Sequence, residues 1–307
     1  MTYEQTLASI AERSEDLIVM TAENRAAIRD LPQILGNRFI DVGICEQTMV
    51  GAAAGLALRG RTPVVHALAT FLTLRAYEFI RTDVGIGNLP VTLVGSVPGF
   101  LSEANGPTHQ AIEDIALMRS IPHMQVFCPA DEKEMVQSIP KIIQSRKPSY
   151  IRYNSCEPVI DHISPFEIGK AEILFKGTDA TILVYGFLLR EAVSAHKSLE
   201  EQGLSIGLIN IRSLKPFDEG AIIAATGESR LLVTVEDHLV NGGLYSILGE
   251  LFLRERMSPW VLPMGLEDRW FKPALLDDVL SYEGFTGRQI AARILAALQK
   301  DKRQKER

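Results

Sequence analysis

Short apolar runs alternate with longer amphipathic segments along the whole chain. In the first half, six runs are predicted to be strands: LIVMTA (17–22), RFIDVGI (38–44), TPVVHA (62–67), PVTLVGS (90–96), MQVFCPA (124–130) and SYIRYN (149–154). Several of them are apolar at nearly every position, which is typical of strands covered on both faces. Helical patterns lie between them, at 47–59, 71–84, 112–119 and 132–145. This order is that of βαβ units and predicts a parallel sheet.

The second half repeats the same kind of pattern. Strands are expected at 179–186, 204–211, 230–237 and 260–266, with helices at 190–202 and 242–254. Between the two series, the stretch SCEPVIDHISPFEIGK has little periodicity and two prolines, so it is interpreted as a linker. The sequence therefore predicts two doubly wound α/β domains, 1–155 and 171–307, joined by a linker at 156–170.

Composition narrows the class of protein. The chain has 307 residues, of which 46% are hydrophobic and 23% charged, the balance of a soluble globular protein. We expect no signal peptide and no membrane span, because the N-terminus is polar and acidic and no apolar run is long enough. Three cysteines are too few for a disulfide framework, which favours a cytoplasmic location.

Charge argues against a nucleic-acid partner. The net charge is −6, and the one basic cluster is the tail KDKRQKER, which is interpreted as the solvated end of a helix.

Candidate chemistry is concentrated in the first half. Glu46 stands where an apolar strand meets a helix whose first turns are almost all Gly and Ala. Small residues would let this helix lie close to the sheet and leave Glu46 poorly hydrated, which is typical of a carboxylate with a special role. The alternative is an ordinary acid in the first turn of a helix.

Two further segments carry polar and aromatic groups near predicted strand ends. The segment ATFLTLRAYEFIRTDV (69–84) mixes aromatic, basic and acidic residues, a pattern that by itself favours core packing. The loop GFLSEANGPTHQ ends in His109, the one histidine of six in a polar loop of this kind. Because α/β proteins bind ligands at the carboxyl ends of parallel strands, His109 is the best candidate for proton transfer.

These motifs resemble the transketolase family. The runs IDVGICEQTMVGAAAGLAL, ATFLTLRAYEFIR and NGPTHQAIEDIALMR are similar to its pyrimidine-binding domain, and the second half, with TVEDHLVNGGL and GLEDRW, is similar to its C-terminal domain. The resemblance implies a thiamine-diphosphate-dependent enzyme that transfers a two-carbon ketol unit from a ketose to an aldose.

A full-length transketolase also carries an amino-terminal domain with a GDG segment for Mg²⁺ and the diphosphate, and this chain contains no GDG. It therefore resembles the C-terminal subunit of a split transketolase. A partner subunit is expected to hold most of the Mg²⁺ and diphosphate site, in an α2β2 heterotetramer, and no metal ligand is expected in this chain.

The resemblance assigns roles to matching positions. Glu46 matches the glutamate that hydrogen-bonds the aminopyrimidine ring, and His109 matches a loop histidine near the reacting sugar. Cofactor contacts are expected from Phe71, Tyr77, Leu74 and, on a looser match, Glu23. Substrate contacts are expected from His109, Asn105, Arg75 and Arg152, the last as an anchor for the phosphate end of the sugar.

The chain departs from the family pattern where sugar phosphates are held. Sugar-phosphate transketolases have a histidine eight residues before an aspartate that precedes the Gly of GPTHQ, and here these positions are Val97 and Asn105. A phosphate-binding Ser falls near Ala27, and the matching Arg has no counterpart, unless Arg25 or the partner contributes. We therefore expect a non-standard sugar or a specialised substrate.

Other functions stay open at this point. Deoxyxylulose-phosphate synthases share the THQ loop and the RAY segment, but they are single long chains. The beta subunits of 2-oxo-acid dehydrogenase decarboxylases have similar length, although their loop normally reads H-S-Q. A non-catalytic partner that kept the fold is a third alternative.

Overall fold

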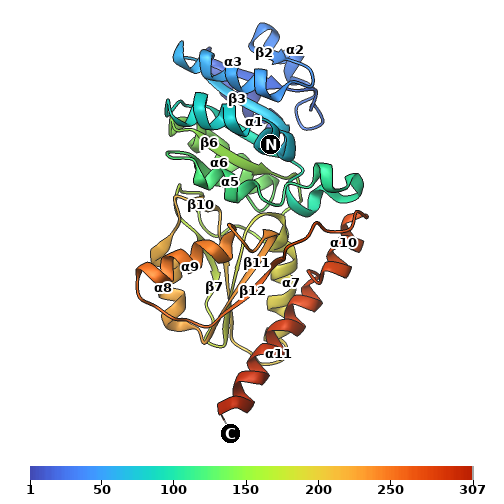
Figure 1. The fold of residues 1–307 in the computed structure, drawn as a ribbon, viewed down its shortest axis with the longest axis vertical. Coiled ribbons are helices and arrows are strands. Elements are labelled where there is room, and N and C mark those ends of the chain that lie inside the picture. Colours follow the sequence, from blue (N-terminus) through green and yellow to red (C-terminus); the bar gives the residue numbers. More distant parts are fainter. Residues whose placement is uncertain (306–307) are drawn as a thin grey trace.

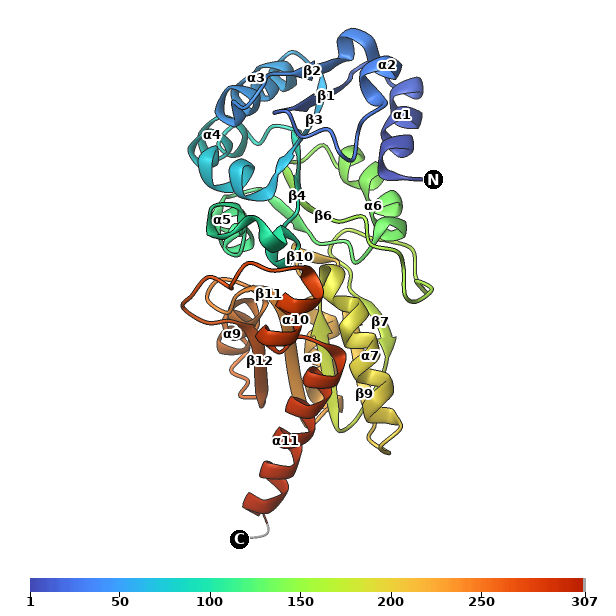
Figure 2. The same cartoon turned by 90° about the vertical axis from the view of Figure 1, so that its right-hand side faces the viewer.

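The computed structural model describes residues 1–305 and contains two α/β units stacked along the long axis (Figures 1 and 2). The first sheet has seven strands in the order β10-β5-β6-β4-β3-β1-β2. Its strands are β1 (Leu17–Thr21), β2 (Phe39–Asp41), β3 (Thr62–Leu68), β4 (Thr92–Ser96), β5 (Gln125–Phe127), β6 (Ser149–Tyr153) and β10 (Ser213–Lys215). All neighbours pair in parallel except β10, which runs antiparallel to β5.

Helices cover both faces of this sheet. Figure 2 shows α3, α4 and α5 on one side and α1, α2 and α6 on the other. Their bounds are α1 (Tyr3–Arg13), α2 (Leu31–Leu35), α3 (Glu46–Leu58), α4 (Tyr77–Phe79), α5 (Asp114–Ser120) and α6 (Glu132–Gln144). Short 3₁₀ helices occupy Gly36–Arg38, Gly99–Asn105 and Pro107–His109.

The second sheet has five strands in the order β12-β11-β8-β9-β7. They are β7 (Glu172–Phe175), β8 (Ala180–Val184), β9 (Ile206–Asn210), β11 (Leu231–Leu239) and β12 (Val261–Leu266), and β7 alone is antiparallel. Around it lie a 3₁₀ turn (Gly186–Leu188) and α7 (Leu189–Glu200), α8 (Glu219–Glu228), α9 (Leu244–Arg254), α10 (Leu276–Glu283) and α11 (Gly287–Lys305). The predicted class, two parallel-sheet α/β domains, is confirmed.

The chain ends in a helix that points away from the body. In both views α11 extends beyond the second sheet (Figures 1 and 2). The predicted helical tail is present as far as Lys305, and Glu306 and Arg307 lie outside the described residues. No helix within residues 1–305 is long and apolar enough to cross a membrane.

The two units are packed against each other. One buried apolar cluster includes Met118 and Tyr150 from the first half and Tyr185 and Leu244 from the second. Strand β10, which the periodicity did not predict, comes from the second half of the chain and extends the first sheet. A three-residue strand is too short to show a period, so the sequence pattern gave no sign of it.

Candidate functional site

Glu46 is the first residue of α3 and lies at the carboxyl edge of the first sheet. The turn that leads from β2 into α3 is held by Asp41, whose Oδ1 accepts the amide hydrogens of Glu23 (3.1 Å) and Gly43 (3.0 Å). Although partial burial alone would raise it, these hydrogen bonds and the Arg25 guanidinium hold the pKa of Asp41 below its ordinary value. The Glu46 side chain is only 2% exposed, as the small residues of α3 predicted.

A chain of contacts joins Glu46 to the loop histidine. Arg75 donates from Nη1 to Oε2 of Glu46 at 2.8 Å, and its guanidinium carbon lies 4.2 Å from the centre of the Phe71 ring. The rings of Phe71 and His109 pack edge to face, with their centroids 4.9 Å apart. Four of the residues singled out in the sequence, from three separate segments, therefore meet at one place.

The helix that carries Phe71 and Arg75 is not a regular α-helix. Phe71–Arg75 and Ile80–Gly85 have π-helical geometry, with one α-helical turn between them. Such bulges re-aim side chains and are frequent at functional sites. The predicted helix at 71–84 is therefore present, but its widened turns could not be read from the periodicity.

The remaining predicted residues do not take part in this chain of contacts among the contacts described. Leu74 is 39% exposed, and Tyr77 is half-buried, with its hydroxyl 2.9 Å from that of Ser120. Glu23 is exposed. Asn105 is also exposed and donates to the Ser102 carbonyl at 2.9 Å.

Arg152 is buried between the two domains. Its side chain is 3% exposed and donates from Nε to Asp114 (2.9 Å) and from Nη1 to Asp237 (2.5 Å), two carboxylates that are also buried. Asp237 belongs to β11, so the ion pairs join the first domain to the second. The guanidinium is used internally in this structure, so nothing here supports the expected phosphate contact, and that role stays a prediction.

One cluster of His and Glu side chains has the spacing of a metal site. Within the described residues, Glu134, His162 and Glu172 can bring one ligand atom each within 4.8 Å of one another. Both ring nitrogens of His162 are hydrogen-bonded to carboxylates, Nδ1 to Glu172 at 2.7 Å and Nε2 to Asp131 at 2.9 Å. Although burial opposes it, these bonds raise the pKa of His162 to about 10. A doubly protonated imidazole has no lone pair for a metal, so this cluster is an ion-pair network that anchors the linker.

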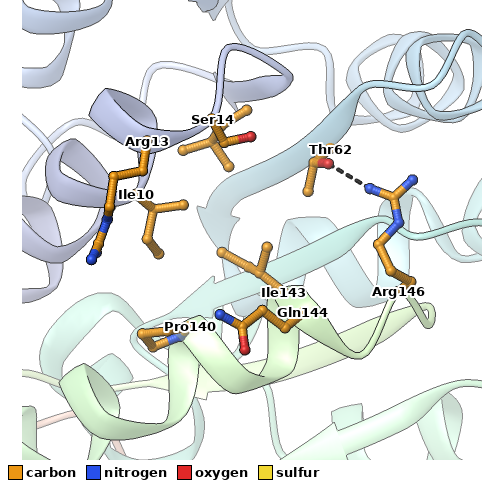
Figure 3. Close-up of a pocket in the computed structure, with 9 residues that line it drawn as sticks. Ile10, Arg13, Ser14, Thr62, Pro140, Ile143, Gln144 and Arg146 are labelled. Carbon is orange, nitrogen blue, oxygen red and sulfur yellow. Dashed lines mark hydrogen bonds between the residues drawn. The ribbon is translucent and has the colours of Figure 1, made fainter.

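Two cavities lie at opposite edges of the first sheet. One, of about 510 Å³, is lined by residues that begin strands or end helices, such as Leu17, Thr62 and Ser14. In this cavity Arg146 donates a hydrogen bond to the Thr62 hydroxyl at 2.7 Å, drawn as a dashed line in Figure 3. The other, of about 570 Å³, is lined by Asn24, His66, Ser96, Val97 and Tyr153, at the carboxyl ends of β1, β3, β4 and β6. We call it the sheet-end cavity. Open α/β sheets bind ligands at this edge, so it is the better candidate.

Sequence reasoning missed the residues that hold this edge in place. Asp114 and Asp237, the partners of Arg152, sit in EDIALMR and TVEDHL, segments that were noticed only for their resemblance. His66 was not among the residues predicted for the site, yet it lines the sheet-end cavity. A histidine inside an apolar strand (TPVVHA) was the available signal.

Comparisons with known proteins identify the family. The transketolase pyrimidine-binding domain matches residues 1–156, and the transketolase C-terminal domain matches residues 169–290. A 6-deoxy-6-sulfo-D-fructose transketolase subunit, SqwH, of Clostridium sp. (strain MSTE9) is 33% identical over 94% of this chain and 91% of its own length. A 1-deoxy-D-xylulose-5-phosphate synthase of Synechococcus sp. (strain JA-3-3Ab) is 37% identical over 96% of this chain but only 46% of its own length.

A solved structure described as a split-gene transketolase, inactive β4 tetramer, superimposes with a TM-score of 0.87 at 31% identity and covers 97% of both chains. Both domains, the relatives and the structural neighbour point to one family. The chain belongs to the transketolase family, and its two α/β units correspond to the family's pyrimidine-binding and C-terminal domains.

Proposed function

We propose that this chain is the C-terminal subunit of a split transketolase that transfers a two-carbon ketol unit from a ketose to an aldose with thiamine diphosphate. The observation that carries the proposal is the contact chain from the buried Glu46 through Arg75 and Phe71 to His109. It combines a carboxylate shielded from water, an aromatic face and a proton-transfer group within one short path.

The residues fit the pyrimidine half of the cofactor. Thiamine diphosphate supplies, when bound, the carbon nucleophile and the electron sink of the reaction. Glu46 would hold a proton against a nitrogen of the pyrimidine ring, in a place where 2% exposure keeps water from competing. Phe71 would stack on that ring, and His109 would face the sugar.

Arg75 has a part in this arrangement that the sequence did not suggest. It now neutralises the buried carboxylate of Glu46, so it would have to give up some of that bond for Glu46 to reach a cofactor. Its side chain is 37% exposed, which leaves it room to turn outward, toward a substrate.

The diphosphate and Mg²⁺ belong, in this proposal, to a partner subunit. Mg²⁺ requires oxygen ligands in octahedral arrangement. In the described part of the chain, the metal-like cluster around His162 is an ion-pair network, with both ring nitrogens bonded to carboxylates. We therefore expect two copies of this chain to assemble with two copies of a subunit that contains a GDG segment.

A second candidate function has a specific observation in its favour. The 37% identity to a deoxyxylulose-phosphate synthase covers nearly all of this chain. In that case the two-carbon donor would be pyruvate, with loss of CO₂, instead of a ketose.

The test is reconstitution of the pair from separately purified subunits with Mg²⁺ and thiamine diphosphate. We expect the chain alone to bind the cofactor weakly and to be inactive, and the pair to be active with a ketose donor. Consumption of pyruvate with release of CO₂ would favour the second candidate. Full turnover by this chain alone would refute the proposal.

A further inference from the structure

The sheet-end cavity is a site whose lining has its own chemistry. It opens at the edge of the sheet where Glu46 and His109 also lie, and Leu101, which lines it, belongs to the loop that continues to His109. The segment that lines the cavity at Leu101 therefore leads within one loop to His109.

Its charge is the opposite of what an anionic substrate needs. None of the residues lining the cavity is Lys or Arg, whereas Glu4, Glu132 and Glu157 are among them. Two of these carboxylates are fixed in place, since Glu4 accepts the amide of Asp30 and Glu132 that of Tyr3, both at 2.6 Å. Fixed like charges raise the cost of placing a phosphate or sulfonate there.

The cations that the sequence offered nearby are used elsewhere. Arg25 is paired with Asp41 and 52% exposed, and it does not line the cavity. Arg152 is held between Asp114 and Asp237 at the domain interface. Within residues 1–305, neither candidate guanidinium is therefore positioned to hold an anion in the cavity.

The cavity does contain a polar group suited to a hydroxyl. His66 is fully buried, and neither of its ring nitrogens has a hydrogen-bond partner. Burial lowers the pKa of His66 to about 4, so the ring is neutral and offers one donor and one acceptor. Buried polar groups are seldom left unpaired, and such exceptions are expected where a ligand or water completes them.

Aromatic rings flank this histidine. Tyr3 stacks on His66 with centroids 5.7 Å apart, and Tyr153 meets it edge-on at the same distance. Rings of this kind pack well against the C–H faces of a carbon chain. Of the two tyrosines, Tyr153 lines the cavity and Tyr3 is buried behind it, so the wall combines the Tyr153 ring with one unpaired imidazole.

The backbone at the cavity is strained as well. Val97 has φ = +57°, a conformation that β-branched residues rarely adopt, and it precedes Pro98, which further restricts it. Strain of this kind persists only where the surrounding structure enforces it, and it gathers at ligand sites. It fixes Val97 in the lining of the cavity.

We propose that the sheet-end cavity receives the non-reacting end of the substrate and selects an uncharged, hydroxyl-bearing end over one that carries a phosphate or sulfonate. This inference rests on the proposed function for the identity of the reacting end. Its chemistry is that of an unmodified sugar or polyol: hydroxyls for His66, and a carbon chain for the Tyr153 ring.

The first experiment measures kcat/KM of the reconstituted pair for two acceptors that differ only in charge, D-erythrose and D-erythrose 4-phosphate. We expect the neutral sugar to be favoured by about tenfold or more, equivalent to about 1.4 kcal/mol. Val97→Arg, which places a cation in the cavity, should shift the ratio at least about tenfold toward the phosphate. Val159→Arg, at a half-exposed linker position, is the matched control and should leave it unchanged. A wild-type preference for the phosphate, or an unchanged ratio in Val97→Arg, would overturn the inference.

The second experiment needs no catalysis and separates this inference from the proposed function. Saturation-transfer NMR on the purified assembly uses two unreactive probes, D-arabinitol and D-arabinitol 5-phosphate. We expect transfer to the neutral probe, and for Val97→Arg a gain of transfer to the phosphate. If no donor is turned over but this pattern is seen, the proposed function fails and the cavity's selectivity stands. Transfer to the phosphate alone in the wild type overturns the selectivity.

Discussion

Replacing Arg152 by methionine should destabilise the isolated chain severely. Methionine keeps the length of the side chain but removes its charge, so Asp114 (0% exposed) and Asp237 (2% exposed) would be left buried without their cation. Breaking a buried ion pair by removal of one partner costs about 3–5 kcal/mol. At about 2–4 °C per kcal/mol for a chain of a few hundred residues, the Tm should fall by about 6–20 °C.

The assay is thermal unfolding of the chain alone, without partner, cofactor or substrate. Arg25→Met is the matched control, since it breaks an ion pair in which the arginine is 52% exposed. Such pairs contribute about 0–1 kcal/mol, so the control should lose at most about 4 °C. The double variant Arg152→Met/Asp237→Asn should recover part of the loss, because it removes one of the two stranded charges.

The competing interpretation predicts a different pattern. If Arg152 held the phosphate of a substrate, Arg152→Met would unfold at nearly the temperature of Arg25→Met and would raise KM for phosphorylated sugars. That combination would refute the argument that the Arg152 guanidinium is committed to the domain interface.

Four further outcomes follow from the site and the linker. Glu46→Gln should lower kcat of the reconstituted pair by about 10²- to 10⁴-fold with little change in Tm, and near-normal turnover would show that the buried carboxylate moves no proton. His109→Ala should reduce kcat/KM for the sugar more than cofactor affinity measured by titration calorimetry; the reverse order would place it at the cofactor. Cys45→Ala should retain most activity in the same assay, because the half-buried thiol contacts only a threonine hydroxyl among the contacts described; loss of turnover would make it part of the mechanism. The pKa of His162 is raised from 6.5 to about 10 in the folded state, so its protonation contributes stability that is fully present below pH 6.5 and is lost as pH rises toward 10. The free energy of unfolding, measured with urea, should therefore fall less steeply over that pH window in His162→Gln than in the wild type. His123→Gln, at an exposed site, is the control and should fall as the wild type does.

Periodicity was sufficient for the parts of the fold that repeat. The long strands β1, β3, β4, β8, β9 and β11 are nearly continuous apolar runs, and each was located within a few residues. The short strands β7 and β10 and the helices α1, α2, α8 and α10 were not predicted. An edge strand of three or four residues has too few positions to show a period, and β10 was further hidden because its partner β5 lies in the other half of the chain.

The sequence could predict only those site residues whose role follows from their own residue type and from their neighbours in the sequence. Glu46 could be singled out because the small residues that bury it follow it directly in sequence, and the structure leaves it 2% exposed. Its pairing with Arg75 could not be predicted, because it depends on widened π-helical turns that set the direction of a side chain 29 residues away. The ion pairs of Arg152 could not be predicted for a related reason. Motif similarity identifies an arginine, but only the fold shows that two carboxylates already enclose it.

The same two carboxylates give the second domain a part in the site. Asp114 begins α5, directly after the loop that holds His109, and Asp237 lies in β11 of the second domain. A second bond runs from the Gln110 side chain to the Phe271 carbonyl at 2.8 Å, and a third from the Leu239 amide to the Ile112 carbonyl at 2.9 Å. The chain that follows His109 is therefore tied to the second domain within a few residues. A loop of 3₁₀ turns has little hydrogen bonding of its own to fix its geometry, so these bonds, and the Arg152 ion pairs among them, hold the imidazole against Phe71. It follows that the second domain, which supplies none of the four residues in the contact chain, helps to set the position of His109.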